Sequence, residues 1–245
     1  MINVENLQKS FGDVNALRGV TFTAPDGQIT GLLGPNGAGK TTTLRIVYAV
    51  LRPDRGRATV DGRDSTTATH AVQQRIGVLP ESDSQGLYPR LTARENVRYY
   101  GRLHGLEGVG LEHRIDELIE MLDMWEIADR RTEGFSHGER LKVAIARALV
   151  HGPQNVLLDE PTTGLDVMST RSMRDVICGL RDEGKAVLFS SHVMQEVSAL
   201  CDRIVVIAQG RIVASGTPDD LRRKTGHADL EDAFVAVIGS GRGLR

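Results

Sequence analysis

Gly34-Pro-Asn-Gly-Ala-Gly39-Lys40-Thr41 is the stretch of sequence that decides the fold. An apolar segment, residues 29–33, comes directly before it, and a helical pattern over residues 42–51 follows it. The spacing G-x4-G-K-[ST] between a strand and a helix predicts a loop whose backbone N–H groups surround phosphate oxygens, with the positive end of the helix behind them. A chance glycine-rich turn is the alternative, and the flanking pattern makes it the weaker one. The predicted phosphate-binding residues are Gly34, Pro35, Asn36, Gly37, Ala38, Gly39, Lys40, Thr41 and Thr42.

Two side chains of this loop have specific predicted roles. Lys40 is placed to reach the β- and γ-phosphates of a nucleotide, and the Thr41 hydroxyl is placed to bind Mg²⁺. A second Mg²⁺ ligand and a base are expected after a buried strand. Residues 156–158 are apolar and end in Asp159-Glu160, so Asp159 is the predicted Mg²⁺ ligand and Glu160 the base that activates water. The alternative for these two residues is a strand end with solvated acids.

The rest of the chain predicts an α/β fold with a mostly parallel sheet. Apolar runs at 156–158, 186–189 and 204–208 alternate with helical patterns at 169–180 and 193–200, as in a parallel sheet covered on both faces. These patterns define the main body of the predicted fold.

Two further parts are expected within one domain over residues 1–235, followed by a tail over 236–245. The first 90 residues read as short strands, with a hairpin signal at Asp61-Gly62, and predict an N-terminal antiparallel β subdomain. Residues 92–150 carry apolar side chains at helical spacing and predict an inserted helical subdomain.

Two polar segments complete the candidate site. Ser136-His-Gly-Glu139 has the pattern of a capping box, which satisfies free N–H groups at a helix start. Gly138 is not needed for capping, and a small residue there also suits a helix N-terminus that faces a phosphate. His192 follows the strand at 186–189, at the sheet edge where α/β proteins bind ligands, so it is a candidate γ-phosphate contact.

Composition limits the functional classes. The 245 residues are 40% hydrophobic and 25% charged, as in a soluble globular protein, and the formal net charge of −2 disfavours nucleic-acid binding. Cys178 and Cys201 lack metal-ligand spacing and are expected to be buried thiols. No signal peptide or membrane span is expected, so work at a membrane would require another subunit.

The order of these motifs resembles the ATP-binding subunits of ATP-binding cassette (ABC) transporters along almost the whole chain. The resemblance implies that Phe11 stacks on adenine, that Ser136, Gly138 and Glu139 belong to the signature segment, and that Asp166 belongs to a loop crossing a dimer interface. It implies catalytic roles for Glu160 and His192. The usual signature is Leu-Ser-Gly-Gly-Gln, and here Phe135, His137 and Glu139 differ from it; Glu81 stands where a glutamine that ligates Mg²⁺ is usual.

The resemblance also implies the working assembly. Two subunits, as a homodimer or a heterodimer, face head to tail around two ATP molecules, with Mg²⁺ as cofactor, and drive a separate membrane permease from the cytoplasmic face. Residues 86–97 and 229–234 are similar to the ABC-2 exporter branch of sodium-extruding and multidrug systems.

A soluble ABC ATPase acting on ribosomes or nucleic acid is the alternative. It is disfavoured by a single phosphate loop, no heptad run and no net positive charge. A regulatory cassette without turnover is disfavoured by the presence of Glu160 and His192.

Overall fold

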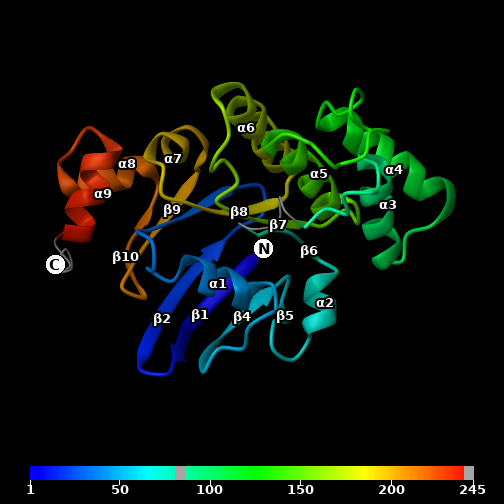
Figure 1. The fold of residues 1–245 in the computed structure, drawn as a ribbon. Coiled ribbons are helices and arrows are strands. Elements are labelled where there is room, and N and C mark those ends of the chain that lie inside the picture. Colours follow the sequence, from blue (N-terminus) through cyan, green and yellow to red (C-terminus); the bar gives the residue numbers. More distant parts are fainter. Residues whose placement is uncertain (81–85, 240–245) are drawn as a thin grey trace.

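The computed structural model describes residues 1–80 and 86–239, which form two sheets flanked by helices (Figure 1). The first sheet is antiparallel, in the order β2 (Val14–Ala24), β1 (Ile2–Phe11), β4 (Arg55–Val60) and β5 (Arg63–Asp64). The second is in the order β10 (Arg211–Gly216), β9 (Arg203–Ala208), β3 (Ile29–Leu33), β8 (Ala186–Ser191), β7 (Asn155–Asp159) and β6 (Ile76–Leu79). Only β10 runs antiparallel to its neighbour, so this described sheet is mostly parallel, as predicted.

The central parallel strands are buried on both faces, which is why their sequences are continuously apolar. The helices are α1 (Lys40–Val47), α2 (Thr69–Gln73), α3 (Ala93–Leu103), α4 (Gly108–Met121), α5 (His137–Leu149), α6 (Val167–Asp182), α7 (Met194–Leu200), α8 (Pro218–Thr225) and α9 (Leu230–Gly239). In Figure 1, α3, α4 and α5 gather at one end of the molecule, and α8 and α9 lie at the other.

The predicted helical insertion consists of α3, α4 and α5. The periodic residues Ile115, Leu118 and Ile119 are buried in a core that extends to the parallel sheet. Thr92 caps α3 with a full capping box. We call α3, α4 and α5, with the turns between them, the helical subdomain.

The carboxyl ends of β3, β7 and β8 meet at one edge of the parallel sheet. Leu33 pairs with Ser191, and Asp159 pairs with Ser190. The loop that begins at Gly34 and the acids at 159–160 therefore start from β3 and β7, the two strands that flank β8. This register brings together side chains that lie more than a hundred residues apart in sequence.

Several boundaries differ from the sequence prediction. The first helix was expected over residues 42–51, but α1 ends at Val47, because Tyr48 caps it and Ala49 has a positive φ of 65°. The strands of the first 90 residues were expected to be short, but β1 runs from Ile2 to Phe11, because it pairs along its length with β2. Cys178 and Cys201 are free thiols. Among the described residues, no helix is both long and apolar enough to span a bilayer.

Candidate active site

The phosphate loop, residues 34–42, joins β3 to α1, and its shape depends on two glycines. Gly39 caps α1 with a φ of 110°, and a Cβ there would lie 2.8 Å from the carbonyl oxygen of Ala16. A Cβ on Gly34 would lie 2.2 Å from the carbonyl oxygen of Ile207. Only glycine fits both places, so the loop is held against β9 and β2 at the N-terminal end of α1, where helix N–H groups can face an anion.

Lys40 lies at the start of α1 with its ammonium group turned back over the loop. Its Nζ donates a hydrogen bond to the carbonyl oxygen of Gly34 at 2.8 Å and lies 3.4 Å from Oε1 of Glu160. The side chains of Lys40 and Glu160 are only 7% and 8% exposed. Among the residues that the structure describes, Glu160 is the one carboxylate paired with this buried cation, which is well placed to accept a more highly charged anion such as a phosphate group.

Glu160 has an unusual backbone conformation. Its φ is 53°, which a non-glycine residue seldom adopts. Its N–H donates to both the carbonyl oxygen and the hydroxyl of Ser190, at 3.2 and 3.0 Å. Its other carboxylate oxygen, Oε2, lies 2.9 Å from Nδ1 of His192. β7 and β8 thus fix the carboxylate between Lys40 and His192, and strain of this kind is typical of functional positions.

Asp159, at the end of β7, is buried, and the Ser190 hydroxyl donates to its Oδ1. No role was predicted for Ser190 from the sequence. Here Ser190 orients both acids at once. Within residues 1–80 and 86–239, no cluster of three or more His, Cys, Asp or Glu side chains is arranged as a metal centre.

A cavity of about 310 Å³ lies above the phosphate loop. Residues 35–42 line it together with Ala16 and Glu160. The structure therefore gathers most of the predicted phosphate-binding residues and the predicted base around one space. The cavity is lined mainly by polar atoms, which suits a charged occupant more than an apolar one.

Comparisons with known proteins agree with this geometry. Residues 17–163 match the family model described as ABC transporter. The chain belongs to the ABC transporter family. It is 44% identical over 245 residues to the ABC transporter ATP-binding protein NatA of Bacillus subtilis, covering 98% of this chain and 99% of that protein. It is 38% identical to the Nod factor export ATP-binding protein I of Burkholderia lata, covering 90% of this chain and 72% of that protein.

A solved structure supports the same assignment. The ATP-binding cassette MJ0796, a dimer in a post-hydrolysis state bound to ADP and Pi, is 25% identical with a TM-score of 0.79, covering 89% of this chain and 98% of that chain. The chain is thus the ATP-binding subunit of an ABC exporter. It has the ABC ATPase fold and is an ABC transporter ATPase.

The segment predicted to be the ABC signature forms the start of α5, and its residues do not line the cavity above the phosphate loop. Ser136 caps the helix: its hydroxyl accepts from the N–H of Glu139 at 3.2 Å, and its own N–H donates to Oε2 of Glu139 at 2.7 Å. This hydrogen bond from Ser136 lowers the pKa of Glu139. The predicted capping box is confirmed. None of Ser136, Gly138 and Glu139 lines the phosphate-loop cavity of their own chain.

Phe11 also lies apart from that cavity. Phe11 ends β1 and is 50% exposed, with Lys9 Nζ 5.6 Å from its ring centroid. Its ring is open to stack on a ligand, although it does not line the cavity itself. Glu81 lies outside the described residues.

Proposed function

We propose that this ABC ATPase hydrolyses ATP by using Glu160 as the general base, with His192 and Lys40 holding its carboxylate. The observation that carries the proposal is the pair of contacts to Glu160, 3.4 Å from Lys40 Nζ and 2.9 Å from His192 Nδ1. When ATP binds, the Lys40 ammonium group would leave Glu160 and contact the β- and γ-phosphates. Glu160 would then be free to accept a proton from the attacking water. His192 would then contact the γ-phosphate and keep Glu160 in position.

Mg²⁺ fits the donors on this side of the loop. The Thr41 hydroxyl borders the cavity, and the buried Asp159 carboxylate ends the neighbouring strand. Both are hard oxygen donors, which Mg²⁺ prefers. Thr41 and Asp159 would hold the ion, with Glu81 as a third proposed ligand. When bound, Mg²⁺ would supply neutralisation of the charge that develops on the phosphates.

Phe11 would stack on adenine. The segment Ser136–Glu139 would meet an ATP bound to a second subunit, with Ser136 and Gly138 as its phosphate contacts and Glu139 as the partner that caps the helix with Ser136. The separation of α5 from the phosphate-loop cavity of its own chain supports this division. ATP would then lie between two chains, so that its binding closes the dimer and its hydrolysis releases it.

The permease would dock in a groove between the helical subdomain and the rest of the chain. A hollow of about 370 Å³ opens there, with Tyr100 and His104 on one side and Tyr48 and Gln73 on the other. The hollow has walls from the helical subdomain and from the rest of the chain. A cytoplasmic segment of a permease bound in it would therefore move when these two parts move relative to each other. The protein would then act as a peripheral subunit on the cytoplasmic face of the membrane and drive export of Na⁺ or a drug.

The first test is purification of Glu160→Gln with ATP from native cells in mild detergent, with partners identified by mass spectrometry. A polytopic membrane protein in equal amount is the expected result. Ribosomal proteins or nucleic acid in its place would favour the soluble ABC ATPase and reject the transport role. With the permease in vesicles, ATP-dependent ²²Na⁺ flux tests the Na⁺ cargo, and its absence would reject Na⁺.

A further inference from the structure

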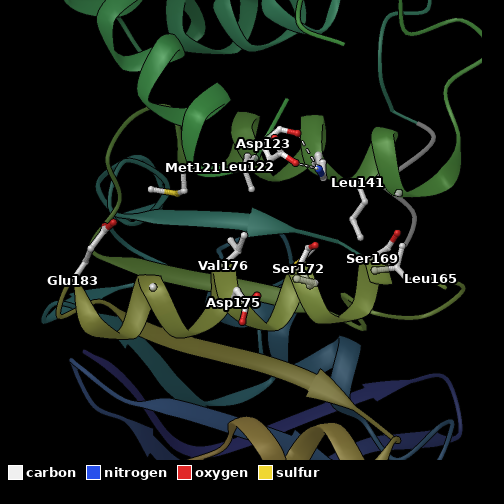
Figure 2. Close-up of a pocket in the computed structure, with 14 residues that line it drawn as sticks. Met121, Leu122, Asp123, Leu141, Leu165, Ser169, Ser172, Asp175, Val176 and Glu183 are labelled. Carbon is white, nitrogen blue, oxygen red and sulfur yellow. Dashed lines mark hydrogen bonds and ion pairs between the residues drawn. The ribbon is translucent and has the colours of Figure 1, made fainter. Parts of the chain in front are cut away.

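A second cavity, of about 300 Å³, lies between α6 and the helical subdomain (Figure 2). Figure 2 shows α6 as one wall, and the end of α4, the turn after it and α5 as the opposite wall. The apolar lining residues are Met121, Leu122, Leu141, Leu165, Met173 and Val176. Its volume falls at the lower end of the range for small-molecule sites. None of these residues belongs to the proposed catalytic machinery.

The two ends of this cavity differ. At one end the walls are close, since a Cβ on Gly138 would lie 3.1 Å from the Ser169 hydroxyl oxygen. Towards the other end, Gly179 leaves α6 without a side chain, and a Cβ there would meet no atom within 4 Å. The cavity is therefore closed next to the signature turn and open beside Gly179. The cavity therefore offers a small molecule an apolar interior and an entrance.

Charged groups at the rim select the kind of molecule. Three carboxylates, those of Asp123, Asp175 and Glu183, accompany a single ammonium group, that of Lys142. Lys142 Nζ already donates to the carbonyl oxygen of Asp123 at 2.9 Å. Glu183 lies 3.4 Å from Lys185 Nζ, whereas within the described ranges the side chain of Asp175 has neither a hydrogen bond nor an ion pair. The rim therefore carries excess negative charge, and a carboxylate with no protein cation beside it.

We propose that this cavity binds a small amphiphilic organic cation, with its apolar tail between α6 and the helical subdomain and its charged group at the Asp175 and Glu183 rim. An apolar interior favours an alkyl chain, and the rim carboxylates favour a positive head group. An organic anion would meet the three carboxylates without a free ammonium group to pair with. A neutral molecule could donate a hydrogen bond to them but would lack the attraction between opposite charges.

A molecule bound in the cavity affects ATPase activity through the contacts at the closed end of the cavity. Ser169, which faces Gly138, donates its N–H and hydroxyl to Asp166 at 2.9 and 2.7 Å and so fixes the start of α6. A molecule that contacts both α6 and α5 fixes the distance between the start of α5, at Ser136–Glu139, and the loop before α6 that contains Asp166. This regulatory effect rests on the proposed function, since it assumes that both segments meet ATP in the dimer.

Binding is tested first without nucleotide, by isothermal titration of the full chain with octylammonium. We expect saturable one-site binding, at least about tenfold tighter than that of octan-1-ol or octanoate and weaker at high salt, because exposed charges are screened. Gly179→Leu, which places a side chain in the open space, should abolish binding, while its melting temperature and ATP affinity stay unchanged. The absence of saturable binding, or equal binding by Gly179→Leu, would overturn the proposal.

The charge requirement has its own matched control. Asp175→Asn combined with Glu183→Gln should weaken octylammonium binding several-fold. Asp182→Asn removes a charge from the same helix outside the lining and should leave binding unchanged. Equal affinity for octan-1-ol and octylammonium would reject the cationic class. ATPase activity that does not change at saturating octylammonium would reject the regulatory role. Loss of ATPase activity in the untreated protein would instead reject the proposed function, so the two failures are distinguishable.

Discussion

His192 Nδ1 lies 2.9 Å from Oε2 of Glu160, while the other oxygen of that carboxylate faces Lys40. The carboxylate is nearly buried, and the His192 ring is about half exposed. The Glu160 carboxylate is therefore held in place without nucleotide. ATP can attract Lys40 away from it, whereas His192 can remain in contact with it. This asymmetry separates the expected effects of the three residues.

Glu160→Gln should stop turnover and leave ATP binding intact. Glutamine keeps the shape of the side chain but cannot accept a proton from water, so kcat should fall by about 100-fold or more. ATP affinity by titration should stay close to the wild-type value, and ATP should stabilise a dimer in size-exclusion chromatography. Glu126→Gln, at an exposed position, is the control and should behave like wild type. Wild-type hydrolysis by Glu160→Gln would show that the base is another residue.

His192→Ala should lower kcat without lowering stability. The exposed ring contributes little burial, so the melting temperature should stay within about 2 °C of wild type. Without the imidazole, Glu160 keeps Lys40 as a partner but loses its orientation, and kcat should fall about tenfold or more. His192→Gln can still donate a hydrogen bond and should recover part of that loss. A lower melting temperature with unchanged kcat would assign His192 a structural role.

The sequence was most informative where residue type and backbone geometry are coupled. Gly34 and Gly39 fit only as glycine, and the motif that contains them located the loop, the strand before it and the helix after it. The Asp61-Gly62 hairpin was likewise confirmed, because both residues adopt positive φ. What could not be predicted depends on pairing across long separations. Ser190 contacts both Asp159 and Glu160 only because β7 and β8 are neighbours in one register.

Lys40→Ala should weaken ATP binding itself. The ammonium group is buried beside the loop and is the cation proposed to meet the β- and γ-phosphates, so ATP affinity should fall by about tenfold or more. Glu160 would also lose the cation next to Oε1. Binding of a fluorescent ATP analogue measures the change, and Lys224→Ala, at an exposed position of α8, is the control. Unchanged affinity would contradict the assignment of the phosphate loop.

Ser136 has two roles that a pair of variants can separate. Ser136→Ala and Glu139→Ala each break the capping box, so each should lower the free energy of unfolding by about 1 kcal/mol. Only Ser136→Ala removes the hydroxyl proposed to contact the phosphate of a partner chain. We therefore expect a greater loss of ATP-dependent dimerisation for Ser136→Ala in the Glu160→Gln background. Equal dimerisation by both variants would leave Ser136 as a cap alone.

His151 should make the protein less stable in mild acid. Its ring stacks on His104 with 3.9 Å between centroids, and burial, followed by the charge of His104, lowers the pKa of His151 from 6.5 to about 4. Burial also lowers the pKa of His104. Between pH 6.5 and 4 the unfolded chain binds the proton more readily than the folded chain. The stability that neutral His151 contributes is therefore complete above pH 6.5 and is lost as the pH falls to about 4.

The loss due to His151 should reach at most about 3 kcal/mol in the free energy of unfolding, measured by urea denaturation at each pH. His151→Phe keeps an aromatic ring against His104 and removes the titrating group, so its stability should fall less steeply over this range. His227→Phe changes an exposed histidine and should keep the wild-type slope. If His151→Phe and wild type lose stability in parallel between pH 6.5 and 4, the carboxylates titrating at lower pH, and not this stacked pair, account for the acid sensitivity.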